Sequence, residues 1–246
     1  MLTIGVDLAA APKKTGLAAI EWSRGHAALR LLKLAPNDAE IVAESRDATT
    51  IGIDCPFGWP VEFVEFVSAH IKSEVAPRTL AGADWRRQLA YRETDRFVRE
   101  HTGRWPLSVS TDRLGLTAMH CAELLEEFAN AGEIVDRSGR GRLVEVYPGA
   151  AVRFWGLTTA GYKSDVNMRA IATNDLIRQA PWLHIEPDSI ALMSRSDDAF
   201  DAVIAALNAR AHALGLTTRI PDALLAAAKS EGWTALPTAP LEVLID

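Results

Sequence analysis

The chain lacks several features that define particular classes of protein. Its only cysteines, Cys55 and Cys121, lie far apart without metal-ligand spacing, which argues against a disulfide framework and suits a reducing compartment. No run approaches the roughly 18 apolar residues that a membrane-spanning helix needs. The first residues also lack the basic region, apolar stretch and cleavage site of a signal peptide. We therefore expect a cytoplasmic protein that does not engage a membrane.

Several catalytic motifs are missing as well. The sequence has no Gly-x-Ser-x-Gly elbow, no cysteine with a plausible histidine partner and no P-loop lysine pattern. It also lacks an excess of positive charge, since 26 Lys+Arg against 32 Asp+Glu give a formal net charge of −6. The chain as a whole is therefore not a basic nucleic-acid coat. Its 246 residues, 48% of them hydrophobic, are enough to bury a full globular core.

Hydrophobic patterning predicts an α/β protein with a mixed sheet. Strands are predicted for residues 2–8, 16–22, 27–34, 49–54 and 142–147. Short turn sequences separate the first three, which predicts an antiparallel meander, whereas the last two are buried strands that stop before prolines. Helices are predicted for residues 37–45, 61–71, 85–101, 116–131, 150–155, 165–179 and 197–214. This order places the sheet at the centre with helices around it.

The long stretch from about residue 60 to 135 shows no strand pattern and three helical patterns. No repeat and no low-complexity segment divides the chain. We therefore expect a single domain over residues 1–246, with a helical insertion at about 60–135.

Acidic residues stand where the predicted strands end. Asp7 and Asp54 end two strands, Glu145 lies in a third, and Asp198 and Asp201 lie three residues apart on the last long helix. In open α/β sheets, ligands bind at the carboxyl ends of the strands. Carboxylates that converge there repel each other unless they are protonated or neutralised by a cation. We therefore expect Mg²⁺ or Mn²⁺, held by Asp7, Asp54, Glu145 and Asp201.

Each acid also has a structural interpretation. Asp7 and Asp54 are equally consistent with capping a loop backbone, and Glu145 with the solvated face of an edge strand. Asp198 belongs to a Ser-Asp-Asp sequence that is typical of a helix N-terminus. Asp201 fits this explanation less well, because it lies a turn further into the helix among apolar neighbours.

Seven short motifs, in this order, resemble those of one known family. They are Gly5-Val6-Asp7-Leu8-Ala9, Lys14-Thr15-Gly16-Leu17-Ala18, Ile53-Asp54-Cys55-Pro56-Phe57-Gly58, Glu145-Val146-Tyr147-Pro148, Tyr162-Lys163, Asp198-Ala199-Phe200-Asp201-Ala202 and Glu231-Gly232-Trp233. The chain thereby resembles, nearly end to end, the predicted-nuclease family of ribonuclease H-like fold known as domain of unknown function 429. The resemblance implies a mixed five-stranded sheet, with three antiparallel strands and the others parallel, and helices on both faces.

The resemblance also implies metal-dependent cleavage of phosphodiester bonds. The catalytic residues would be Asp7, Asp54, Glu145, Asp198 and Asp201. Two-metal chemistry of this kind needs no side-chain nucleophile, which agrees with the missing motifs.

A second group of residues is expected to contact substrate. Arg92 and Asp95 match the family locally, although most arginines nearby are also consistent with surface ion pairs on a solvated helix. Ser110 and Arg113 lie in a loop that would approach the acids, and Lys163 would pair with an acid or with a phosphate. The expected partner of the protein is therefore a nucleic acid.

The sequence thus predicts a metal-dependent nuclease, and two other functions stay open. Actin-like ATPases and sugar kinases also open with a strand and a Gly-x-Asp sequence, but they need further glycine-rich loops that the region after Glu145 lacks. A non-catalytic scaffold that binds nucleic acid or protein through its arginines is the second alternative. Thermal stabilisation by ATP would identify an ATPase or kinase. Absence of Mn²⁺-dependent cleavage would identify a scaffold.

Overall fold

The chain folds around a seven-stranded mixed sheet in residues 1–76, 78–158 and 160–245, which are the residues described by the computed structural model. The strand order is β6-β3-β2-β1-β4-β5-β7. The strands are β1 (Leu2–Asp7), β2 (Gly16–Ser23), β3 (His26–Leu34), β4 (Thr50–Asp54), β5 (Leu143–Val146), β6 (Leu183–His184) and β7 (Thr234–Ala235). Strands β1 to β3 are antiparallel, while β4, β5 and β7 continue the sheet in parallel with β1. The predicted α/β class and mixed sheet are confirmed.

The strand count differs from the five that the sequence predicts. Each of the five predicted stretches matches one of the strands β1 to β5 to within one residue at either end. The additional strands, β6 and β7, contain two residues each and lie at opposite edges of the sheet. Two residues are too few to show an alternating pattern, so these strands depend on tertiary pairing.

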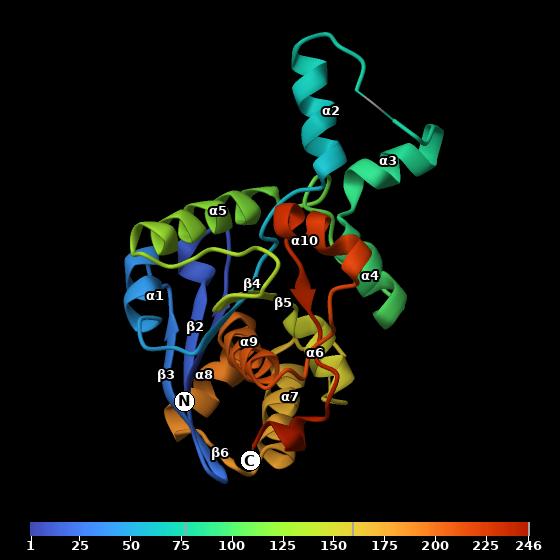
Figure 1. Cartoon of the computed structure of the whole chain (residues 1–246). Coiled ribbons are helices and arrows are strands. Elements are labelled where there is room, and N and C mark those ends of the chain that lie inside the picture. Colours follow the sequence, from blue (N-terminus) through green and yellow to red (C-terminus); the bar gives the residue numbers. More distant parts are fainter. Residues whose placement is uncertain (77, 159, 246) are drawn as a thin grey trace.

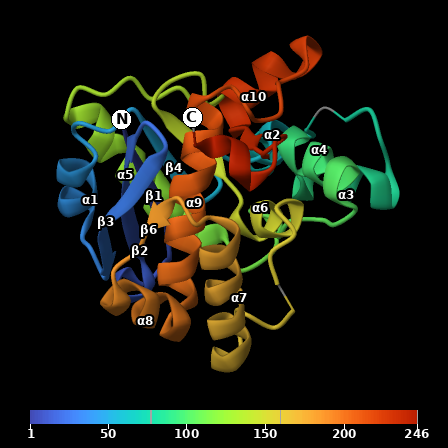
Figure 2. The same ribbon diagram turned by 90° about the horizontal axis from the view of Figure 1, so that it is seen from below.

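Helices cover both faces of the sheet (Figures 1 and 2). One face packs against α9 (Asp197–Ala213), flanked by α6 (Pro148–Phe154), α7 (Val166–Gln179) and α8 (Pro187–Arg195). The other face packs against α1 (Asp38–Glu44) and α5 (Gly115–Asn130). Helix α1 begins with the expected cap, because the Asn37 side chain accepts a hydrogen bond from the Glu40 N–H and Glu40 reciprocates.

Helix α9 lies directly on the sheet because small residues meet along the contact. A Cβ atom on Gly5 would lie 2.1 Å from the carbonyl oxygen of Ala202, and one on Gly16 would lie 2.3 Å from that of Asp198. Only glycine therefore permits this approach. The helix is buried from Ala199 to Ala211, and its close contacts with Gly5 and Gly16 determine which residues face the sheet.

The stretch between β4 and β5 contains α2 (Val61–Ile71), α3 (Gly82–Ala90), α4 (Glu93–Thr102) and α5. In Figure 1, α2 and α3 extend beyond the rest of the molecule. The single helix predicted for residues 85–101 is wrong, because the chain is extended at Arg92, with φ −67° and ψ 164°. The Arg92 N–H donates to the Asp95 carboxylate and so starts a new helix, α4.

The sequence prediction also omitted helix α8 and α10 (Leu225–Glu231). Helix α10 has few charged residues and an alanine-rich run that favours no single face. Within the described residues, no helix combines the length and the apolar character needed to cross a membrane.

Candidate metal centre

Three carboxylates meet at the carboxyl end of the central strands. Asp7 and Asp54 are the last residues of β1 and β4, and they are direct neighbours in the parallel register. Asp201 comes from α9, which lies over these strands. One oxygen from each of the three carboxylates lies within 4.8 Å of the other two, a spacing that allows them to share one cation.

Side-chain alternation explains why these acids face the same way. In β1, Ile4 and Val6 point into the core beneath α1 and α5, so Gly5 and Asp7 face α9. In β4, Asp54 likewise shares its face with Gly52, which lies against α9. The glycines let the helix approach, and the acids two residues later project beside it.

Burial and mutual repulsion make this cluster costly to ionise. Burial raises the pKa of Asp7 well above its ordinary value, and the carboxylates of Asp201 and Asp54 raise it further. Burial also raises the pKa of Asp54, to about 7. The pKa of Asp201 is raised by burial as well, although Lys163 and Tyr162 counteract the rise. A bound cation would replace the protons that the cluster otherwise retains.

Two consecutive residues from the loop between α6 and α7 hold Asp201 in place. The Tyr162 hydroxyl donates a hydrogen bond to Asp201 Oδ1 at 2.9 Å, and Lys163 Nζ lies 2.7 Å from Oδ2. Burial works against the charge of Lys163, but the Asp201 carboxylate outweighs it and raises the pKa of the lysine. The Lys163 side chain is 54% exposed although its ammonium is paired with the buried Asp201. The predicted pairing of Lys163 with an acid is therefore present.

Glu145 lines the same cavity and is close enough to Asp54 to raise its pKa, but it is not one of the three clustered acids. In the parallel register of β4 and β5 it is the neighbour of Ile53, not of Asp54, so it projects from the opposite face of the sheet. Both of its oxygens already have two donors. Oε2 accepts from the Phe57 N–H and Arg92, and Oε1 accepts from Arg92 and the Thr234 hydroxyl. This position corrects its predicted place among the metal ligands.

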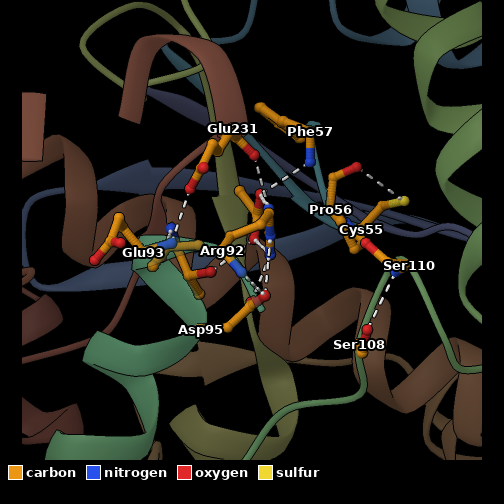
Figure 3. A network of polar contacts seen from close by, with 12 residues as sticks. Cys55, Pro56, Phe57, Arg92, Glu93, Asp95, Ser108, Ser110 and Glu231 are labelled. Carbon is orange, nitrogen blue, oxygen red and sulfur yellow. Dashed lines mark hydrogen bonds and ion pairs between the residues drawn. The ribbon is translucent and has the colours of Figure 1, made fainter. Parts of the chain in front are cut away.

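Arg92 and Asp95, which we expected to contact substrate, belong to the same buried network (Figure 3). The Arg92 guanidinium makes five hydrogen bonds, to both oxygens of Asp95, both oxygens of Glu145 and the Glu231 carbonyl. Since arginine has five N–H donors, none is left for a ligand. Burial opposes the charge of Arg92, but the two carboxylates raise its pKa.

Glu231 completes this network and explains its motif. Its carboxylate accepts from the N–H of Val61 at 2.9 Å and from the N–H of Glu93 at 2.8 Å. Those residues begin α2 and α4, so one side chain caps two helices. In Figure 3 Glu231 lies beside Glu93, at the margin of the network. The motif Glu231-Gly232-Trp233 singled out this residue in the sequence, but it did not predict that the side chain caps two helices.

The remaining predicted site residues are more peripheral. Asp198 lies near enough to Asp7 to raise its pKa, but it is partly exposed and lies close to Lys14 and to Ser196, which caps α9. Ser110 is partly buried in the loop before α5, and Arg113 is exposed. Neither of these two loop residues lines the cavity described next.

A cavity of about 520 Å³ opens above the acids. Asp7 and Asp54 lie in its wall, while Asp201 lies behind Tyr162 and Lys163. Apolar side chains from α4 and the following loop form the other side, and they are Val98, Pro106, Leu107 and Leu114. Arg153 of α6 also lines the cavity and was missed by the sequence prediction, because a lone arginine on a short helix gives no pattern.

Residues 5–225 match the family of proteins of unknown function designated DUF429, and the chain belongs to this family. No curated protein and no solved structure matches the chain.

Proposed function

We propose that this member of the DUF429 family is a divalent-metal-dependent hydrolase that cleaves phosphodiester bonds in nucleic acids. The observation that carries the proposal is the meeting of Asp7, Asp54 and Asp201, from β1, β4 and α9, within 4.8 Å of one another. Asp7 and Asp54 lie at the carboxyl end of parallel strands and in the wall of a cavity, which is the usual position of ligand sites in α/β proteins.

The donor set fits Mg²⁺ or Mn²⁺. All three ligands are carboxylate oxygens, which suit hard divalent cations, and no thiol or imidazole belongs to the group. When ionised, the three acids carry three negative charges, and Lys163 supplies one positive charge. One divalent cation neutralises the remainder and removes the repulsion that raises the pKa of Asp7.

The residues of the site have distinct tasks in the proposed reaction. Asp7, Asp54 and Asp201 would hold the cation, and Tyr162 orients Asp201 through its hydroxyl group. Lys163 would exchange Asp201 for a phosphate when the cation takes over that carboxylate, because an ammonium can pair with either anion. When bound, the cation acts as a Lewis acid that lowers the pKa of water and stabilises the leaving oxygen.

The arrangement of the sheet supports a ribonuclease H-like fold, the finer fold assignment that we propose. Its central strands run in the order β3-β2-β1-β4-β5, with the first three antiparallel and β4 and β5 parallel to β1. Strands β6 and β7 are additions at the edges. The acids at the ends of β1 and β4 and on α9 agree with the sites that the family resemblance implies.

The test is cleavage of labelled single-stranded and double-stranded DNA, RNA and hybrid in the presence of Mn²⁺. We expect Asp7→Asn to abolish cleavage and to weaken Mn²⁺ binding, measured by titration calorimetry. Asp84→Asn is the matched control, because the Asp84 side chain is 72% exposed on α3, outside the cavity. It should behave as the wild type.

The same preparations distinguish the alternatives. Unchanged Mn²⁺ binding in Asp7→Asn, or cleavage that persists in this variant, would refute the proposal. Stabilisation by ATP without cleavage would favour a phosphotransferase. Nucleic-acid binding that does not need a metal and survives Asp7→Asn would favour a scaffold.

A further inference from the structure

Two arginines line the cavity above the acid cluster, and they differ in their partners. Arg92 has an acceptor for each of its five donors. Arg153, on α6, makes no ion pair within the described residues, and its Nη2 is buried without a hydrogen-bond partner there. Its guanidinium lies against the Tyr147 ring, whose centroid is 5.9 Å from the guanidinium carbon. A buried donor without an acceptor is costly, and an anionic ligand would remove this cost.

The cavity is of the size that holds a small ligand. Its volume of about 520 Å³ lies within the range typical of small-molecule sites, roughly 300–1,000 Å³. It is bounded by the strand ends on one side and by α4 and the loop before α5 on the other. Enzymes whose reacting atoms lie inside such pockets act on unpaired or extruded nucleotides, because a stacked duplex cannot enter.

The wall of the cavity combines charged and apolar groups. Asp7, Asp54, Lys163 and Arg153 are charged groups of the wall, and Leu107 and its apolar neighbours add apolar surface. The charges of Arg92, Asp95 and Glu145 in the same wall are paired with one another. A nucleotide combines the same two kinds of surface, with a phosphate at one end and a flat base that packs on apolar and aromatic side chains at the other. Arginine suits the phosphate, because its planar group donates two parallel hydrogen bonds.

We propose that Arg153 binds the phosphate of a single unpaired nucleotide, so that the substrate enters the cavity as a single-stranded end and not as a duplex. This inference rests on the proposed function and adds the substrate class and the residue that recognises it. Arg153 and Lys163 share the cavity wall with Asp7 and Asp54, and Lys163 is paired with Asp201 behind it. Three carboxylates therefore lie near two cationic side chains, so the cation is needed to make the cavity attractive to an anion.

The experiment measures binding, not turnover. The probe is uridine 5′-monophosphate, which has no diester to cleave, titrated calorimetrically into protein saturated with Mn²⁺. Inorganic phosphate and uridine are titrated separately. Their affinities measure what the phosphate and the nucleoside each contribute to binding of the nucleotide. We expect Arg153→Gln to raise the dissociation constant at least about tenfold, as loss of a charge-assisted hydrogen bond does. Arg153→Lys should recover part of the affinity.

Arg86→Gln is the matched control, because Arg86 is exposed on α3 and outside the cavity. It should bind the probe as the wild type does. Mn²⁺ titration of each variant confirms that the acid cluster remains intact. A single-stranded oligonucleotide should displace the probe, whereas a duplex closed by hairpins at both ends should not.

Three results would overturn the inference: no binding of the nucleotide by the Mn²⁺-loaded wild type, equal binding by Arg153→Gln, or equal displacement by the closed duplex. Each is distinguishable from failure of the proposed function, which would appear as missing cleavage or as Mn²⁺ binding that Asp7→Asn leaves unchanged. Nucleotide binding that depends on Arg153 but is accompanied by no cleavage would support this inference alone.

Discussion

Replacement of Asp54 by asparagine should stabilise the metal-free protein at alkaline pH. In the folded protein burial raises the pKa of Asp54 to about 7, against 3.8 for the unperturbed group. The folded state therefore keeps a proton over a pH range in which the unfolded state has lost it. Since the unfolded state binds fewer protons in this range, the free energy of unfolding falls as the pH rises from about 4 to about 7. Above pH 7 the contribution is constant.

The size of the effect follows from the shift in pKa. Each pKa unit corresponds to about 1.36 kcal/mol, so a shift of about three units sets an upper limit of about 4 kcal/mol. Asp54 is partly accessible to solvent and shares its protons with Asp7 and Asp201, and both effects reduce the penalty. We expect about 2 kcal/mol of stabilisation by Asp54→Asn at pH 8 and almost none at pH 4.

The assay is urea unfolding of both proteins with a chelator between pH 4 and pH 8, followed by circular dichroism. The quantity of interest is the difference between variant and wild type, which removes the contributions of other titrating groups. Asp84→Asn, at an exposed position, should show no such difference. Parallel pH profiles of Asp54→Asn and wild type would refute the reasoning. Mn²⁺ at 100 times its dissociation constant should then stabilise the wild type by about 2.7 kcal/mol, and the same concentration should stabilise the variant less.

Three further predictions concern the surroundings of the cluster. Glu145→Gln should lower the free energy of unfolding by about 2–4 kcal/mol in urea, because Arg92 loses a buried partner, while Mn²⁺ affinity stays unchanged. Lys163→Met should raise Mn²⁺ affinity severalfold at pH 8 in calorimetry, since the ammonium no longer competes for Asp201. Gly5→Ala should destabilise the protein by about 3 kcal/mol or prevent folding, because its Cβ would lie 2.1 Å from a carbonyl oxygen of α9.

Each of these predictions has a contrary outcome. A lower Mn²⁺ affinity in Glu145→Gln would show that Glu145 is a metal ligand. Reduced Mn²⁺ affinity in Lys163→Met would show that the lysine supports the site instead of competing with the cation. Gly115→Ala is the control for Gly5→Ala, because the nearest atom to its added Cβ is 3.9 Å away. Equal stability of the two glycine variants would contradict the packing argument.

The fold could be predicted from the sequence where local patterns were strong. Strand β4 combines a β-branched apolar run with a proline-bearing loop, and α2 was predicted with its observed bounds, Val61–Ile71. The break between α3 and α4 was missed although it has a local signal, which is that the Asp95 carboxylate accepts from the Arg92 N–H and so caps α4. Helical periodicity continues across the break, and nothing local shows that the arginine turns inwards to Glu145.

The acid cluster was predictable for a related reason. Asp7 and Asp54 end adjacent parallel strands, so their proximity follows from topology alone. Glu145 was misplaced because the face of a strand residue depends on register, and a shift by one residue reverses it. The pattern of apolar residues does not fix the register between β4 and β5, because a long helical segment separates them in the sequence.

The outer margin of β3 has a consequence for the behaviour of the protein at high concentration. Strand β6 covers β3 only at Ala27 and Ala28, so the strand is otherwise the margin of the sheet on this side. Arg30 and Lys33 follow along this margin, and the pairing of β2 with β3 is irregular between Ala19 and Ile20. Charged side chains and a local irregularity are devices by which natural sheets avoid recruiting strands from other molecules. The sheet is therefore protected against lateral growth into aggregates.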